Sequence, residues 1–183
     1  MLKSTRFTAT SAMVAGIALA VAGVIIVTDT QSSQSTVVGI EHVSLAGLSL
    51  ACLAMIAPFR YLARLAGASK AAVVAPIGLV ALALISLISN IRGEDLSIFP
   101  AVAGPANLMI FGGFVAVGIG LRRRAGLPLA LAIGLPFSWI LTIPAAAIGG
   151  CVLAGAFWMT VAYLIANQGL GRTDSDLPEP ARA

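Results

Sequence analysis

The sequence predicts an all-α fold: a polytopic integral membrane helical bundle with six transmembrane helices and cytoplasmic N and C termini. The 183-residue chain is 59% hydrophobic and only 10% charged, with a mean hydropathy of +1.02, whereas a soluble domain is about 25% charged. Its apolar runs are near the roughly 20 residues that cross a hydrocarbon layer about 30 Å thick. When these runs are read as six spans, ten of the eleven Lys and Arg residues fall on one side of the membrane. This asymmetry is the one that the positive-inside rule describes.

Hydropathy separates the first four spans. The predicted spans are about 9–27, 37–57, 71–89, 96–120, 127–143 and 146–166. The first run is longer than the apolar core of a signal peptide and lacks a small-x-small cleavage site, so we expect it to be retained. The second run ends at Pro58, the third at Asn90 and the fourth at an arginine triplet.

The last two spans are predicted from a stretch of 40 uncharged residues, 127–166. One helix of that length would be about 60 Å long, twice the hydrocarbon thickness. Pro144 disfavours helical geometry in the residue before it, so a tight turn near residues 143–146 is the simplest way to fold the stretch back. The even number of spans also returns Arg172 and Arg182 to the basic side.

The distribution of charge gives the orientation and the domain organisation. The basic side carries Lys3, Arg6, Arg60, Arg64, Lys70, Arg122, Arg123, Arg124, Arg172 and Arg182, and only Arg92 lies opposite. Residues 1–170 form one transmembrane domain, and the Pro-containing charged tail 171–183 is predicted to be disordered. We expect a multi-pass protein of the plasma membrane. Arg outnumbers Lys and the chain is built largely of Ala, Gly, Val and Leu, which suits a bacterial gene of high GC content, so the expected location is a bacterial inner membrane.

Rows of small residues indicate where helices pack closely. Such rows recur at every fourth position on three predicted spans. They are Ala12, Gly16 and Ala20; Gly112, Ala116 and Gly120; and Cys151 with Gly155. The rows fit a compact bundle, docking of a membrane protein partner, or homo-oligomer formation, and their number is also what an Ala- and Gly-rich chain gives by chance.

A few polar residues at membrane depth are candidates for ligand binding, because such groups are costly in lipid. The candidates are Glu41, His42, Asn107, Trp139 and Thr142. If their helices are neighbours, these residues describe an outward-facing cavity with Glu41 and His42 at the rim and Asn107 at the floor. Four of them have a plainer alternative: Glu41 and His42 as interface or structural residues, Asn107 as a hydrogen-bonding link between helices, and Trp139 in an aromatic belt.

The arginine triplet Arg122, Arg123 and Arg124 is a candidate lipid-headgroup site, with orientation as its primary role. The net charge of +4 comes from clusters beside apolar runs, so we expect no nucleic acid partner. The single histidine excludes a two-histidine metal site within the chain, and we expect no metal, no cofactor and no catalytic residues. The axial positions of Cys52 and Cys151 differ by roughly 14 Å, too far for a disulfide.

Two functions are consistent with these features. The first is a non-catalytic accessory, assembly or interaction subunit, which the small-residue rows and the scarcity of buried polar groups favour. The alternative is a small solute transporter, channel or ligand-binding membrane protein that uses the polar cavity. An enzyme ranks third, because Glu41 with His42, or Glu94 with Asp95, would need help from groups that the sequence does not place.

Overall fold

The computed structural model describes residues 2–28, 39–94, 96–124, 129–143 and 145–167. Its helices are α1 (Leu2–Thr28), α2 (Glu41–Leu65), α3 (Ala71–Arg92), α4 (Phe99–Arg124), α5 (Leu129–Thr142), the short 3-10 helix η1 (Ala146–Ile148) and α6 (Gly150–Ala166). The predicted all-α fold is confirmed for these residues. The predicted disordered tail 171–183 lies outside them and stays a prediction.

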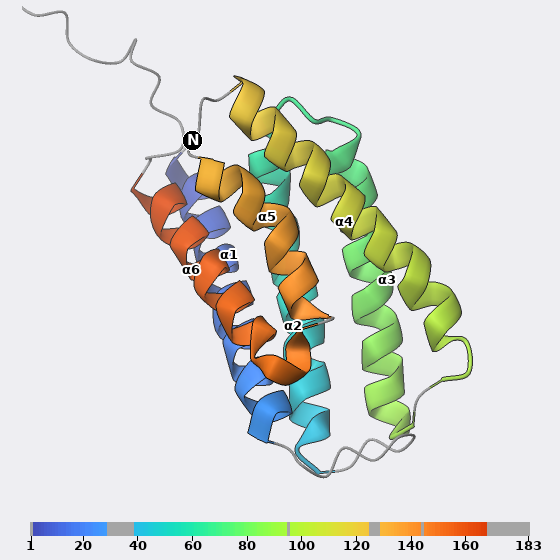
Figure 1. Cartoon of the computed structure of the whole chain (residues 1–183). Helices are drawn as coiled ribbons and strands as arrows, with labels where there is room; N and C mark the ends of the chain where they lie inside the picture. The colour runs from blue at the N-terminus through green and yellow to red at the C-terminus, as the bar shows by residue number, and fades with distance from the viewer. Residues whose placement is uncertain (1, 29–38, 95, 125–128, 144, 168–183) are drawn as a thin grey trace, which may run out of the picture.

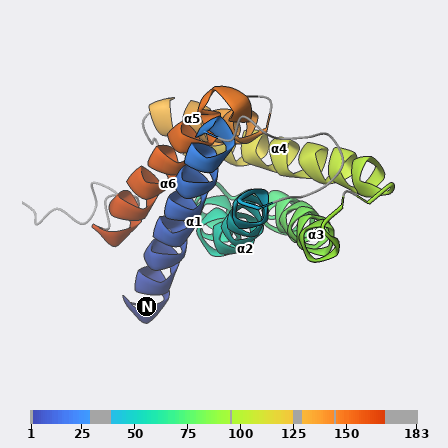
Figure 2. The same cartoon turned by 90° about the horizontal axis from the view of Figure 1, so that it is seen from below.

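The helices form two layers that close into a ring. Figure 1 shows α4, α5 and α6 in front of α1, α2 and α3, and Figure 2 shows the same layers from below. Each helix packs against the next one in sequence, and α1 packs against α6 more extensively than any other pair of helices packs. A direct contact between α2 and α4 crosses the middle of the ring.

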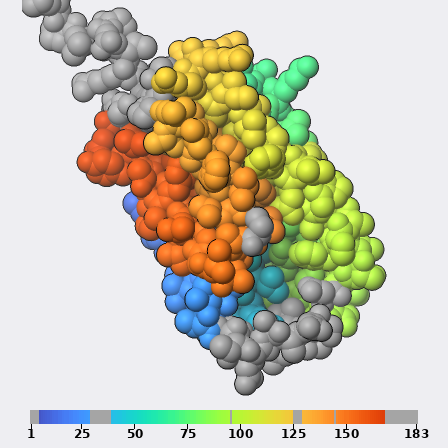
Figure 3. Space-filling model, viewed as in Figure 1, coloured from blue at the N-terminus to red at the C-terminus, as the bar shows by residue number. Residues whose placement is uncertain are grey.

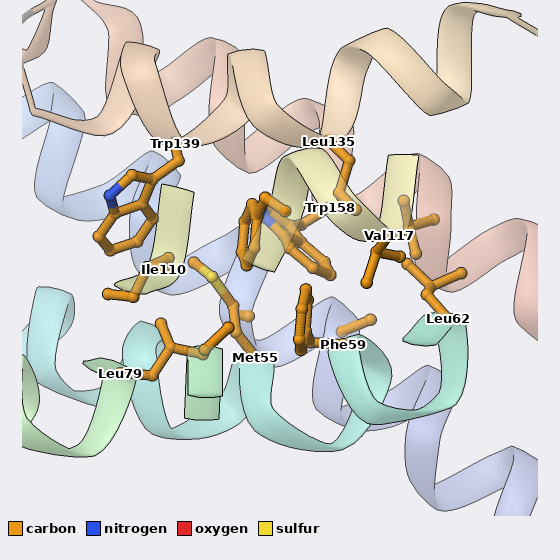
Figure 4. Packing of buried hydrophobic residues seen from close by; sticks show 14 of the residues in the cluster. Met55, Phe59, Leu62, Leu79, Ile110, Val117, Leu135, Trp139 and Trp158 are labelled. Carbon is orange, nitrogen blue, oxygen red and sulfur yellow. The ribbon is translucent and has the colours of Figure 1, made fainter. Parts of the chain in front are cut away.

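The core of the bundle is aromatic at its centre. The Phe114 ring on α4 stacks on Phe59 of α2 with ring centroids 4.9 Å apart. Its edges contact Trp139 of α5 at 5.9 Å and Trp158 of α6 at 6.0 Å. Figure 4 shows Phe59, Trp139 and Trp158 within this cluster. Since Trp139 is only 4% exposed, it belongs to the core and not to an aromatic belt facing headgroups.

The second helix does not end at Pro58 but continues to Leu65. A proline has no N–H, so Pro58 leaves the carbonyl of Ala54, four residues earlier, without its helical partner. The Ser11 hydroxyl of α1 donates a hydrogen bond of 2.7 Å to this carbonyl. An interhelical bond therefore replaces the missing helical one, which is how membrane helices tolerate proline.

Close approach of α1 and α6 depends on glycine. A Cβ atom added to Gly155 would lie 2.5 Å from the carbonyl oxygen of Gly16 and 2.9 Å from the backbone nitrogen of Ala20. The predicted rows on the first and sixth spans thus pack on each other. The row on the fourth span behaves differently, because Gly112 and Ala116 are exposed and only Gly120 packs, against Ala66.

Four of the described helices, α1 to α4, are long and apolar enough to cross a membrane. The apolar helices α5 and α6 are shorter, with 14 and 17 residues, or about 21 and 26 Å. Between them the chain turns through η1 and Gly149, whose φ of 87° is left-handed. Large apolar side chains are exposed around the bundle, among them Leu108 (74%) and Ile148 (85%). The protein is therefore an integral multi-pass helical membrane protein.

The two ends of the bundle differ in charge. Arg64 lies in the last turn of α2, Lys70 precedes α3, and the arginine triplet occupies the last turn of α4. These positions are at the upper end in Figure 1, together with the start of α1. Arg92, in the last turn of α3, is at the opposite end. The basic residues that the structure describes are thus gathered as the sequence predicts.

Candidate functional site

A cavity of about 170 Å³ lies inside the half of the bundle away from the basic end. Its walls come from five helices: Leu19 of α1, several residues of α2 including Cys52 and Met55, two residues of α3, and residues from the start of α4 and the end of α5. Figure 3 shows atoms of α2 between α4 and the end of α5, where the front surface is hollowed. The cavity exists there because α5 stops at Thr142 while α4 continues alongside.

Three of the four polar residues that line this cavity come from the neighbouring helices α4 and α5, which form one of its walls. The polar lining residues are Ser86, Asn107, Trp139 and Thr142, and the other lining residues are apolar or, in the case of Cys52, weakly polar. None of the lining residues is Asp, Glu, Lys, Arg or His. The cavity therefore suits a neutral molecule that is mainly apolar, because an ion would have no charged partner there.

Asn107 and Trp139 link α4 to α5 at this wall. The Trp139 indole Nε1–H donates to Oδ1 of Asn107 at 3.1 Å. The Asn107 side-chain nitrogen donates to the carbonyl of Ala103 at 2.8 Å, one turn earlier on the same helix. An amide nitrogen carries two N–H groups, so one donor of Asn107 remains beyond these two bonds. Asn107 thus links α4 to α5 by a hydrogen bond, the plainer of the two roles expected for it, and it also lines the cavity.

Thr142 closes the same wall at the last residue of α5. Its hydroxyl donates to the Ser138 carbonyl at 2.7 Å, and its own carbonyl accepts a hydrogen bond from Cys151 Sγ at 3.1 Å. The second bond ties the end of α5 to the start of α6. Since a hydroxyl oxygen has two acceptor lone pairs, the donation to Ser138 leaves Thr142 able to accept from a bound molecule.

Glu41 and His42 do not line the cavity. Glu41 is the first residue of α2 and therefore lies at the helix end, not four residues inside a span. The His42 ring donates from Nδ1 to Oδ1 of Asn90 at 2.6 Å, and the Asn90 amide donates to the His42 carbonyl at 3.2 Å. His42 consequently connects α2 to α3, and ligand binding by Glu41 and His42 stays a prediction.

Some residues of this region have no signal in the sequence that could single them out. Ser86 and Cys52 line the cavity, but each is a small residue inside an apolar run. Asn90 could be found as a polar residue at the end of a span, but its pairing with His42 joins positions 48 residues apart. Both cysteines are free and buried, consistent with their predicted separation.

The arginine triplet lies apart from the cavity, at the basic end. Arg122, Arg123 and Arg124 are exposed in the last turn of α4. Arg124 lies against Gly67 in the connection between α2 and α3, where an added Cβ would collide with its guanidinium group. Arg122 and Arg123 face a separate groove between α4 and α5.

Among the residues that the structure describes, no group of three or more His, Cys, Asp and Glu residues could hold a metal ion. No family model, no curated protein and no solved structure matches this chain.

Proposed function

We propose that this membrane protein binds a small, neutral, mainly apolar molecule in the cavity between α2, α3, α4 and α5. The cavity of about 170 Å³ with one polar wall is the observation that supports the proposal. An engineered cavity of about 150 Å³ lined by apolar side chains binds benzene, so this volume suits a ring or a short apolar chain. Asn107 and Thr142 would orient the molecule through a single hydrogen-bonding group, as in other ligand sites.

Quenching of tryptophan fluorescence by iodobenzene tests the proposal. Trp139 lines the cavity and Trp158, although 1% exposed, does not. With Trp158 replaced by Phe, we expect saturable quenching of Trp139. With Trp139 replaced by Phe, quenching of Trp158 should only rise linearly with the probe dissolved in the detergent. Linear quenching of both tryptophans would contradict a binding site.

Filling the cavity with a larger side chain should remove the saturable part of the Trp139 quenching by iodobenzene. Ala103 is buried and lines the cavity, whereas Ala116 on the same helix is exposed and does not. Ala103→Leu should abolish saturation, and the matched control Ala116→Leu should leave it unchanged. If Ala103→Leu fails to fold, Cys52→Met fills the same space with a more flexible side chain. Saturation that survives in folded variants would place the probe elsewhere.

The polar residues of the cavity should make it prefer a ligand that carries a hydrogen-bonding group. We expect 4-iodophenol to bind more tightly than iodobenzene, since its hydroxyl can donate to Thr142 and accept from Asn107. Asn107→Leu should reduce this preference while iodobenzene still binds. An unchanged preference would exclude Asn107 from the site.

An accessory or assembly subunit is the second candidate function, and the outward face of α4 favours it. Nothing lies within 4 Å of a Cβ atom added to Gly104 or Gly112, and Ala116 on the same face is exposed. Small residues at this spacing let another transmembrane helix approach closely. We expect a membrane partner or a second copy to co-purify in mild detergent and to be lost on Gly112→Leu. A monomer in native mass spectrometry from the host membrane would contradict this candidate.

The topology that we propose has six spans, with both chain ends in the cytoplasm and the protein in a bacterial inner membrane. Support comes from the position of α5, η1 and α6 in the same ring as the four long helices. The basic ends of α2 and α4 point to the cytoplasmic side. The backbone of the turn is paired internally, for example Gly150 N–H to the Ala145 carbonyl at 2.8 Å, as a turn within the membrane requires.

A further inference from the structure

A groove of about 570 Å³ runs between α4 and α5 on the face seen in Figure 3, separate from the cavity. Its walls are apolar side chains from both helices. They include Val115 and Ile119 of α4 and Leu129, Ile133 and Phe137 of α5. Ile119, Leu129, Ile133 and Phe137 are 46–55% exposed, so this is an open apolar surface that no other part of the described chain covers.

The floor of the groove is backbone and small side chains. A Cβ atom added to Gly118 of α4 would collide with the carbonyl oxygen of Ala132 on α5, so the two backbones touch there. That carbonyl is the one that Pro136 leaves without a helical partner. The groove thus has a floor of Gly118 and Ala132 between larger apolar side chains of α4 and α5, a surface on which a hydrocarbon chain can lie.

One end of the groove is strongly basic. Arg122 and Arg123 line it, and no Asp or Glu is among the lining residues. Both guanidinium groups lie at the end of the bundle that carries the other described basic residues except Arg92. Arg is suited to phosphate, because its planar group donates two parallel hydrogen bonds to phosphate oxygens.

We propose that this groove binds an anionic glycerophospholipid, with its phosphate at Arg122 and Arg123 and an acyl chain between α4 and α5. An apolar channel that ends in two adjacent cations matches the order of groups in such a lipid, from hydrocarbon to phosphate. The site is independent of the ligand proposed for the cavity. The proposal assigns phosphate binding to Arg122 and Arg123 and not to Arg124, which does not line the groove.

Native mass spectrometry of the purified protein with dioleoylphosphatidylglycerol and dioleoylphosphatidylcholine tests the site. One basic side chain near an anionic headgroup is worth about fivefold in affinity, so two give a preference of about 25-fold for the anionic lipid. Arg122→Gln with Arg123→Gln should remove this preference. Arg60→Gln with Arg64→Gln makes the same change in net charge on exposed residues outside the groove and should preserve it.

Two outcomes would overturn the proposal. Equal retention of the two lipids by the unchanged protein would show that no headgroup site exists, and equal loss in the two double variants would assign the preference to overall charge. Glycerophosphoglycerol and inorganic phosphate, which have no acyl chains, distinguish a lipid from a soluble anion. We expect neither to displace the lipid at millimolar concentration, and displacement by either would contradict a role for the apolar groove.

Discussion

Replacing Asn107 with leucine removes the acceptor of the Trp139 indole N–H, and the cost can be worked out from the geometry. Leucine has the same number and branching of side-chain heavy atoms as asparagine, so the substitution mainly removes the hydrogen-bonding atoms. Trp139 is 4% exposed, and its 3.1 Å bond to Oδ1 crosses between α4 and α5. A buried donor left without a partner costs about 1–3 kcal/mol. Interhelical bonds in a membrane protein average about 0.6 kcal/mol and reach about 1.7.

We therefore expect Asn107→Leu to lower the free energy of unfolding by about 1–2 kcal/mol. In the double variant with Trp139→Phe, the donor is absent as well, so the two costs should not add. The coupling energy should be about 0.6–1.7 kcal/mol. Reversible unfolding in mixed micelles of mild detergent and dodecyl sulfate, followed by circular dichroism, measures all four members of the cycle.

Thr160→Val is the matched control, since the Thr160 hydroxyl is exposed and bonds only within its own helix, to Ala156 at 2.9 Å. It should change stability by less than about 0.5 kcal/mol. Additive costs for Asn107→Leu and Trp139→Phe would refute the reasoning, because they would mean that the 3.1 Å contact contributes nothing to joining α4 and α5.

Three further predictions concern the packing and topology of the bundle. Ser11→Ala should lower the unfolding free energy by about 0.6–1.7 kcal/mol, because it removes the interhelical donor to the Ala54 carbonyl that Pro58 leaves free. An unchanged value in the micelle titration would contradict this. Gly155→Leu should prevent α1 from docking and yield aggregated protein on gel filtration. The control Ala156→Leu changes the neighbouring, exposed residue of the same helix and should elute as the unchanged protein does. Identical elution of both variants would argue against the α1–α6 seam. Because α5 is about 21 Å long and the hydrocarbon about 30 Å thick, η1 should lie below the membrane surface. Ile148→Cys should therefore resist a charged maleimide applied to cells, whereas Ser97→Cys, exposed between α3 and α4, should react. Rapid labelling at both positions would place η1 at the membrane surface.

Composition and charge were sufficient to predict the class of fold, because a chain with 10% charged residues cannot cover a soluble surface. The cost of polar groups in lipid singled out Asn107, Trp139 and Thr142 as candidates, and the structure places all three in the lining of one cavity. The cavity that these residues share depends on α4 and α5 being neighbours and on α5 ending early. Helix pairing in lipid is set by close packing, and apolar patterning carries little information about it.

The depth of Glu41 and His42 could not be predicted for a different reason. A hydropathy window that opens at residue 37 places Glu41 inside a span, but α2 begins at Glu41 itself. Residues 37 and 38 lie outside the part of the chain that the structure describes. The chemistry of proline alone predicts that Pro58 leaves a backbone carbonyl without its helical partner. The residue that donates to this carbonyl, Ser11, lies 43 residues earlier than Ala54, and only the assembled bundle brings the two residues together.

The seam between α1 and α6 has a consequence for how the protein is made. A membrane protein is inserted as it is synthesised, and domains fold in order from the N-terminus. The surface of α1 around Gly16 must therefore wait in the bilayer for α6, the last of the described helices in the chain, before its largest contact can form. Until then α2 is the main partner of α1, and the face of α1 around Gly16 is open to lipid or to the wrong helix. A chain truncated after α5 would lack this contact, so we expect such a product to be removed by membrane quality control.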